Sequence, residues 1–255
     1  LPDALNARAE KIAQDTVASF NMGCGQFCTK PGLIIGIKSV EFDRFVEALI
    51  DSTRSAAPQV MLNRGTLKSY HQGIQNLVDA SGFEHIASGL APEMTSQAQA
   101  HLFKADSSLL LEGHALLQHE VFGPMSVVVS VETKAELLQG LNALGGQLTA
   151  TIIGDDSDLA EAADLLQTLT RKAGRVLFNG YPTGVEVCDA MVHGGPFPAT
   201  SDARGTSVGT GAIDRFLRPV CYQNTPQALL PDALKDTNPL NIHRLINGQF
   251  TKNAI

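Results

Sequence analysis

The stretch MSVVVSVETKAELLQGLNALGGQLTATIIG, residues 125–154, joins two β-branched apolar runs through a segment with helical spacing. Residues 125–131 and 148–154 are typical of buried strands, whereas 133–144 has the period of an amphipathic helix. Strands that alternate with such helices predict right-handed crossovers and a mostly parallel sheet. The stretch therefore predicts an α/β fold built on parallel strands.

The same alternation continues outward from this stretch. Residues 156–174 form the next predicted helix, with Asp156 or Ser157 at its start and Gly174 at its end. The remaining segments predict helices at 4–20, 41–56 and 60–81, and strands at 33–37 and 175–180. Strands that alternate with helices favour a mostly parallel sheet with helices on both faces.

The part of the chain after residue 204 carries weaker signals. GTSVGTG at 205–211 lacks the glycine spacing of a phosphate-binding loop, so we interpret it as a turn leading into a helix at 207–216. LRPVCYQN at 217–224 has the pattern of a lone strand. Residues 226–255 are expected to form a tail that packs on the surface.

Composition excludes several classes of protein. The 255 residues are 44% hydrophobic and 18% charged, which suits a large globular core, and the net charge of −7 argues against a nucleic-acid partner. No run approaches the ~20 apolar residues that span a bilayer, and the N-terminal segment lacks the features of a signal peptide. With only four cysteines, a cytoplasmic protein without membrane partners is expected.

GCGQFCTKPG, residues 23–32, places Cys24 and Cys28 among three glycines. A zinc site needs a further ligand pair, and His114 and His119 are distant in sequence, so no metal site is predicted. A disulfide is disfavoured in a reducing compartment. A nucleophilic thiol fits a glycine-rich loop that exposes backbone amides, although the residues alone leave open that both cysteines are small buried apolar groups.

Other sequence motifs help to decide between a nucleophilic thiol and two buried apolar cysteines. GQFCTKPG, together with HEVFGPMSVV at 119–128 and GRVLFNGYPTG at 174–184, resembles the signatures of the aldehyde dehydrogenase superfamily. GGPFPATSD at 194–202 resembles the branch that holds the 2-oxoglutarate semialdehyde dehydrogenases and the NADP-dependent long-chain aldehyde dehydrogenases. The resemblance covers essentially the whole chain. It implies a catalytic domain at 1–216, with the family's cofactor-binding domain and general-base glutamate in a missing N-terminal half.

The resemblance also implies roles for particular residues. Cys28 matches the nucleophile, whose thiolate attacks an aldehyde to give a thiohemiacetal and then, after hydride transfer, a thioester that water hydrolyses. Cys24 matches a structural position beneath the loop. Glu120 and Phe122 match the residues that hold the nicotinamide ribose and ring of NADP or NAD.

The resemblance implies the residues of the substrate pocket less directly. The residues that would line the aldehyde pocket are Phe27, Phe197, Pro198, Ala199, Thr200 and Ser201. Arg171, Arg175 and Arg204 are available cations for a carboxylate-bearing substrate. His193 is interpreted as a packed loop histidine in preference to a proton shuttle.

The resemblance also implies an oligomeric assembly and an enzymatic activity. Residues 217–225 resemble the strand through which the family forms homo-oligomers. The function implied is oxidation of a small-molecule aldehyde, 2-oxoglutarate semialdehyde first among the candidates. Two alternatives remain: a long-chain aldehyde dehydrogenase, and an inert fragment with at most weak thiol esterase activity.

Overall fold

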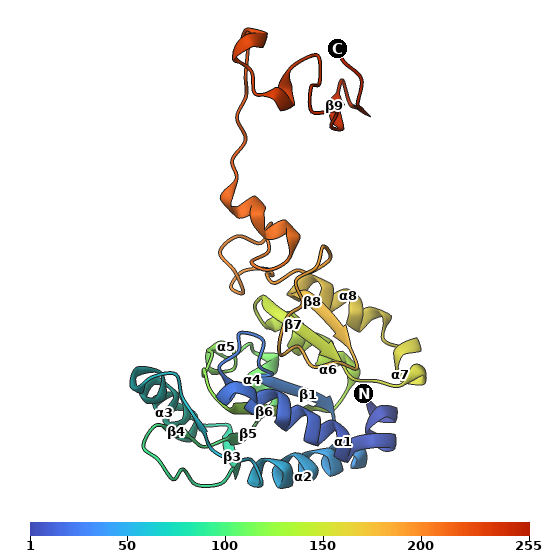
Figure 1. The fold of residues 1–255 in the computed structure, drawn as a ribbon. Coiled ribbons are helices and arrows are strands. Elements are labelled where there is room, and N and C mark those ends of the chain that lie inside the picture. Colours follow the sequence, from blue (N-terminus) through green and yellow to red (C-terminus); the bar gives the residue numbers. More distant parts are fainter. The chain divides into compact units, whose positions relative to one another are not determined.

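The computed structural model describes residues 1–255, which divide into two compact units, Leu1–Arg215 and Phe216–Ile255. The first unit contains the main sheet and its helices (Figure 1). None of the helices combines the length and apolar character needed to cross a lipid bilayer.

The main sheet has four strands in the order β1, β6, β5, β3. Their bounds are β1 Leu33–Ile37, β6 Met125–Val131, β5 His101–Ala105 and β3 Phe83–Ser88. β6 lies between β1 and β5 and is parallel to both, with Leu33 opposite Val127 and His101 opposite Met125. β3 pairs antiparallel with β5 and shifts register between His85 and Ala87.

A second, two-stranded parallel sheet contains β7, Gln147–Ile152, and β8, Ala173–Phe178. The parallel pairs confirm the predicted α/β class with a mostly parallel sheet. The free edges of β1 and β7 lie on either side of the cavity described below, and we call this region the seam. A short antiparallel pair, β2 (Gln59–Val60) with β4 (Gln97–Ala98), completes this unit.

The helices begin where short polar side chains cap them. Ser39, Asn63 and Thr133 accept hydrogen bonds from the backbone N–H three residues later. The helices they begin are α2 Val40–Arg54, α3 Arg64–Val78 and α6 Lys134–Ala143. α1 spans Pro2–Asn21, and α4 Ser107–Leu111 and α5 Ala115–Gln118 are short.

The helix predicted at 156–174 was wrong in extent. It is divided into α7, Asp156–Ala160, and α8, Ala163–Lys172, and Asp155 takes the N-cap position. Gly174 lies in β8, where an added Cβ would stand 2.2 Å from the carbonyl oxygen of Gly194. The glycine therefore serves close strand packing and does not end a helix.

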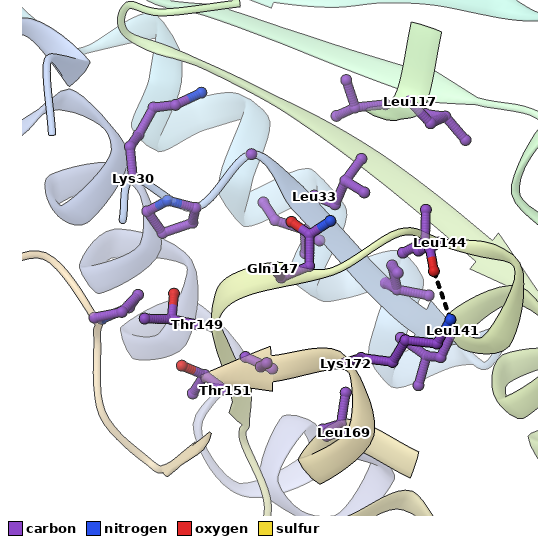
Figure 2. Close-up of a pocket in the computed structure, with 18 of the residues that line it drawn as sticks. Lys30, Leu33, Leu117, Leu141, Leu144, Gln147, Thr149, Thr151, Leu169 and Lys172 are labelled. Carbon is purple, nitrogen blue, oxygen red and sulfur yellow. Dashed lines mark hydrogen bonds between the residues drawn. The ribbon is translucent and has the colours of Figure 1, made fainter. Parts of the chain in front are cut away.

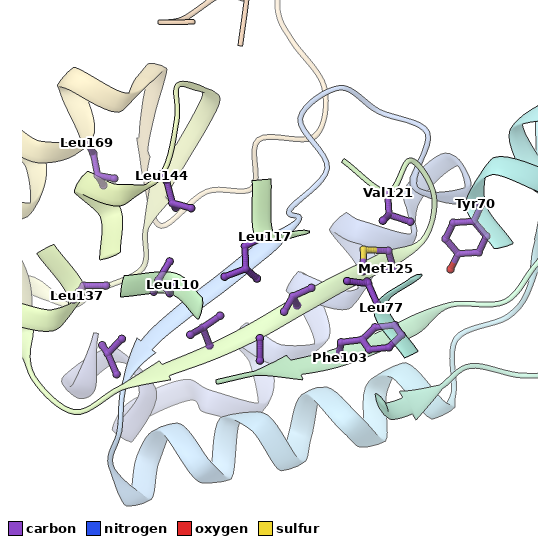
Figure 3. Packing of buried hydrophobic residues seen from close by; sticks show 14 of the residues in the cluster. Tyr70, Leu77, Phe103, Leu110, Leu117, Val121, Met125, Leu137, Leu144 and Leu169 are labelled. Carbon is purple, nitrogen blue, oxygen red and sulfur yellow. The ribbon is translucent and has the colours of Figure 1, made fainter. Parts of the chain in front are cut away.

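Two apolar clusters cover opposite faces of β6, because successive side chains of a strand alternate between faces. Val127, Val129 and Val131 belong to one cluster, and Val128 belongs to the other. The first cluster includes Tyr70 and Leu77 from α3, as Figure 3 shows. The second is built from α1 and α2, through Phe20, Phe42, Phe45 and Leu49. The predicted helices on both faces are confirmed.

The C-terminal segments differ from their predictions. A 3₁₀ helix occupies Thr210–Phe216, in place of the helix predicted at 207–216. Residues 217–223 form no strand, because no segment of this chain pairs with their backbone. The second unit instead contains the hairpin of β9, Arg244–Ile246, and β10, Gln249–Thr251, turned by Asn247 and Gly248 at positive φ.

Candidate active site

The loop 22–32 is shaped by three residues in left-handed conformation. α1 runs into a 3₁₀ turn at Met22–Gly25, where Gly23, Cys24 and Gly25 have φ of 57°, 58° and 63°. A Cβ at Gly25 would lie 2.2 Å from the backbone carbon of Gly123. The glycine is therefore required both by its backbone angle and by close contact with the turn 119–125.

Cys24 lies under this loop and is 1% exposed. Its Sγ contacts the carbonyl oxygen of Gln59 at 3.2 Å and Sδ of Met61 at 3.3 Å, and its N–H donates to the Gln59 side chain. Burial raises the pKa of the Cys24 thiol, which keeps it protonated and unreactive. Cys24 is a packing residue.

Cys28 is exposed, and its Sγ lies 3.0 Å from Nε2 of His193. The His193 backbone is fixed because its N–H donates to Oγ1 of Thr206 and its carbonyl accepts from Ser207. Burial, and then the charge of Arg175, lower the pKa of His193. A neutral imidazole beside a thiol can accept its proton. The prediction of a packed loop histidine missed this contact, which joins residues 165 positions apart.

Lys30 was not singled out by sequence. Its Nζ donates to the carbonyl oxygens of Met125 at 2.8 Å and Val121 at 3.4 Å. Burial lowers the pKa of Lys30 to about 8, and Glu120 opposes this shift. The ammonium therefore ties the cysteine loop to the turn that carries Glu120.

Tyr70 supports the turn 119–125 through hydrogen bonds and through packing of its ring. The phenol oxygen of Tyr70 donates to the carbonyl oxygens of Gln99 and Pro124 at 2.8 and 3.1 Å. The ring leaves no room for a side chain at Gly123, where a Cβ would lie 2.2 Å away. Glu120 is exposed, and the Phe122 ring is 37% exposed. Both side chains are accessible to a ligand.

The segment 194–202 crosses near β7 and β8. The backbone N–H of Gly146 donates to the carbonyl oxygen of Phe197, and Ala199 and Thr200 turn the segment back through bonds to Pro196 and Gly195. Phe197 is 81% exposed. Sequence alone does not indicate which of these residues face the nucleophile.

A cavity of about 540 Å³ brings part of the predicted site together. Cys28, Glu120, Pro198 and Ala199 all line it, whereas the other predicted site residues do not: Phe27, Phe122, Phe197, Thr200 and Ser201. The cavity continues from Cys28 along the seam, where its walls are largely leucine and isoleucine. Figure 2 shows Lys30 and Lys172 on different sides of it.

The arginines proposed for carboxylate recognition are engaged elsewhere. Arg204 is 90% exposed and pairs with Asp202 at 3.0 Å. The Arg175 guanidinium donates to the carbonyl oxygens of Pro182 and Gly184. Arg171 is exposed, and none of the three lines the cavity.

Comparison with known sequences agrees with these motifs. Residues 4–196 match the aldehyde dehydrogenase family. The alpha-ketoglutaric semialdehyde dehydrogenase of Acinetobacter baylyi is 74% identical over 99% of this chain and 48% of that protein. Alpha-ketoglutaric semialdehyde dehydrogenase 2 of Azospirillum brasilense is 48% identical over 97% of this chain and 47% of that protein. The chain spans about half the length of the curated relatives it matches.

Solved structures share the fold. Lactaldehyde dehydrogenase from Escherichia coli has a TM-score of 0.67 at 20% identity, covering 85% of this chain and 45% of that one. Gamma-glutamyl-gamma-aminobutyraldehyde dehydrogenase from Burkholderia cenocepacia has a TM-score of 0.66 at 18% identity, covering 81% and 41%. At these identities the likeness concerns the fold alone. Because the family match spans most of the chain, the protein belongs to the aldehyde dehydrogenase family.

Proposed function

We propose that this chain is the C-terminal catalytic half of an NAD(P)-dependent dehydrogenase that oxidises alpha-ketoglutaric semialdehyde (2-oxoglutarate semialdehyde) to the dicarboxylic acid. The observation that carries the proposal is the exposed Cys28 thiol, 3.0 Å from His193 and in one cavity with Glu120. The substrate is proposed because two relatives named for this semialdehyde match nearly the whole chain.

In the proposed reaction, Nε2 of His193 accepts the proton of the Cys28 thiol. The thiolate then attacks the aldehyde carbon, forming a C–S bond while the carbonyl oxygen becomes an oxyanion. The backbone N–H of Cys28 is a candidate donor to this oxyanion. After hydride loss the substrate is a thioester on Cys28, and water hydrolyses it to the acid and the free thiol.

The residues at the turn 119–125 fit the nicotinamide end of a dinucleotide. Glu120 presents an exposed carboxylate at the cavity that contains Cys28, and a carboxylate can accept hydrogen bonds from two ribose hydroxyls. The accessible ring of Phe122 offers a surface for the nicotinamide. NAD(P)⁺, when bound, would supply the hydride acceptor.

The test is made in the whole dehydrogenase that contains this chain, by following nicotinamide reduction with the semialdehyde. Cys28→Ser should lower kcat/KM at least ~1,000-fold, because a hydroxyl at this position lacks the nucleophilicity of the thiolate. Cys188→Ser, which changes another exposed thiol, is the matched control and should leave the rate unchanged. A Cys28→Ser enzyme with normal activity would contradict the proposal.

One observation favours a second substrate class. The cavity beyond Cys28 is lined mainly by apolar side chains, which suits a long-chain aldehyde. Comparing kcat/KM for decanal and for the semialdehyde separates the two candidates. A higher value for decanal would replace the proposed substrate while leaving the proposed chemistry intact.

Assembly through residues 217–225 is also proposed. The segment is unpaired in this chain, and Leu217, Val220 and Tyr222 are exposed, so a strand from a second subunit could pair with it. Substituting Val220 with proline should weaken self-association in analytical ultracentrifugation, because proline cannot donate a sheet hydrogen bond. Unchanged self-association would count against this surface.

A further inference from the structure

Lys30 is a cation inside the cavity that contains Cys28. The two residues are separated by one position in the loop, and both line the same cavity of about 540 Å³. Lys172 also lines it, and lies on a different side, as Figure 2 shows. A carboxylate in this cavity therefore has two candidate cationic partners.

The two ammonium groups differ in the lengths of their hydrogen bonds to backbone carbonyl oxygens. Nζ of Lys172 donates to the carbonyl oxygens of Leu144 at 2.6 Å and Asn142 at 2.7 Å, which are short bonds at the helix end of α6. Nζ of Lys30 has one bond of 2.8 Å and one of 3.4 Å, and its third N–H has no acceptor. No carboxylate lies within 4.0 Å of Lys30, since none of the ion pairs includes it.

A partly buried cation without a counter-ion is costly, so such groups usually pair with a ligand or another side chain. Burial lowers the pKa of Lys30 to about 8, and the charge of Glu120 offsets this shift only in part. The arginines near the site cannot take the role without giving up their present partners, which are Asp202 for Arg204 and two backbone carbonyls for Arg175.

We propose that Lys30 binds the carboxylate of the substrate through its free N–H donor and thereby selects aldehydes that carry an anionic group. This inference deepens the proposed function and rests on it, because it assumes that the aldehyde reacts at Cys28 in the same cavity. The ligand class is a short dicarboxylic semialdehyde, with its aldehyde at Cys28 and a carboxylate at Lys30.

Binding should depend on pH in a defined direction. The titratable side chains that line the cavity with Lys30 are Cys28, His119, Glu120, Lys172 and Tyr181. The Lys30 ammonium is present below its pKa of about 8 and is lost above it. The dissociation constant of a carboxylate ligand should therefore rise by up to ~10-fold per pH unit above pH 8.

The experiment uses this chain with Cys188→Ser and Cys221→Ser, so that Cys28 is its one exposed thiol. Alkylation of Cys28 by iodoacetamide is followed at pH 7 against increasing glutarate, a dicarboxylate that cannot be oxidised at an aldehyde. The concentration that gives half protection is the measured dissociation constant. Glutaramide, the uncharged analogue, is run in parallel.

Lys30→Met should weaken glutarate protection at least ~10-fold, the loss of one charge-assisted hydrogen bond. Lys30→Arg should keep protection within a few-fold, and Lys172→Met is the matched control that should leave it unchanged. Slow alkylation of Cys24 in each variant verifies that the loop is folded.

Three results would overturn the inference: no protection by glutarate, equal protection by glutaramide, or equal protection in Lys30→Met. Because glutarate does not react, these results are independent of aldehyde oxidation. A failed Cys28→Ser test would instead remove the proposed function and leave the measured anion site in place.

Discussion

Cys24 and Cys28 lie four residues apart in the loop 22–32 and have opposite environments. We call the parts of the loop around them the Cys24 end and the Cys28 end. The Cys24 end is held in left-handed conformation against the turn 119–125, and its thiol is buried against Gln59 and Met61. The Cys28 end is exposed, and its thiol meets His193 from a distant loop. The same side chain is thus a packing group at one position and a candidate nucleophile four residues later, because the backbone conformation, the exposure and the neighbours differ.

Residues on both sides of Cys28 contact the turn 119–125. Gly25 contacts the backbone of Gly123, and Lys30 binds two carbonyl groups of the same turn. The loop carrying Cys28 and the turn carrying Glu120 are therefore fixed to each other on both sides. A candidate nucleophile positioned in this way has less freedom to lose when a substrate binds.

The largest effect is expected from Gly25→Ala. The left-handed angle and the 2.2 Å clash with Gly123 together should reduce the free energy of unfolding by about 3 kcal/mol. Urea denaturation measures this change. Gly32→Ala is the control, because its Cβ would meet only Nζ of Lys30 at 3.9 Å. Equal stability of the two variants would show that the Cys24 end is not rigid.

Replacing His193 tests the environment of the Cys28 thiol. His193→Ala should slow alkylation of Cys28 at pH 7 by about 10-fold or more, because the thiol loses its proton acceptor. Since burial lowers the pKa of His193, its imidazole stays neutral to a lower pH than that of an ordinary histidine. The rate advantage of wild type should therefore be lost at a lower pH than an ordinary histidine would give.

Cys188, an exposed thiol in the same chain, serves as the internal reference for that experiment. Its alkylation rate should be the same with and without the imidazole. If Cys28 alkylates at wild-type rate in His193→Ala, the contact at 3.0 Å has no influence on the thiol.

A smaller effect is expected when the buried cysteine is changed. Cys24→Ser should reduce stability by about 1–2 kcal/mol, because a smaller, polar hydroxyl replaces sulfur in contact with Met61. Cys28→Ser should change stability by less than about 0.5 kcal/mol, since the site is exposed. Urea denaturation of both variants gives the comparison, and a reversed order would contradict it.

The smallest effect concerns Thr29, whose buried hydroxyl donates to the carbonyl oxygen of Pro182 at 2.8 Å. Thr29→Val should cost about 1 kcal/mol or less, because Arg175 also donates to this oxygen. Thr53→Val is a matched control, because the buried hydroxyl of Thr53 has no partner. That variant should be neutral or more stable in thermal unfolding, and a similar loss in both would remove the assigned role of Thr29.

Several strands were predictable because their patterns are local. β1, β6, β7 and β8 contain β-branched or apolar runs, and the alternation along β6 determines its two buried faces. β3 and β5 were not predicted, since FEHIAS and HLFKA include charged or histidine side chains that interrupt the pattern. Their pairing with each other and with β6 supplies what the local sequence lacks.

The candidate site also has features that the sequence could predict and features that it could not. The glycine-rich segment and the turn with Glu120 could be recognised from contiguous residues, and the structure places Cys28, Glu120, Pro198 and Ala199 on one cavity. The predicted strand at 217–224 pairs with no other segment of this chain, so the local pattern alone was insufficient there.

The sequence by itself determined the alternation of strands and helices, the family, and the loop that carries Cys28, because each is encoded in spacing over a few residues. Only the tertiary structure decided that His193 contacts Cys28, that Cys24 does not share its exposure, and that Lys30 lines the same cavity. The physical reason is that burial and contact depend on how distant segments pack, and nothing in the spacing of residues 28 and 193 encodes their distance.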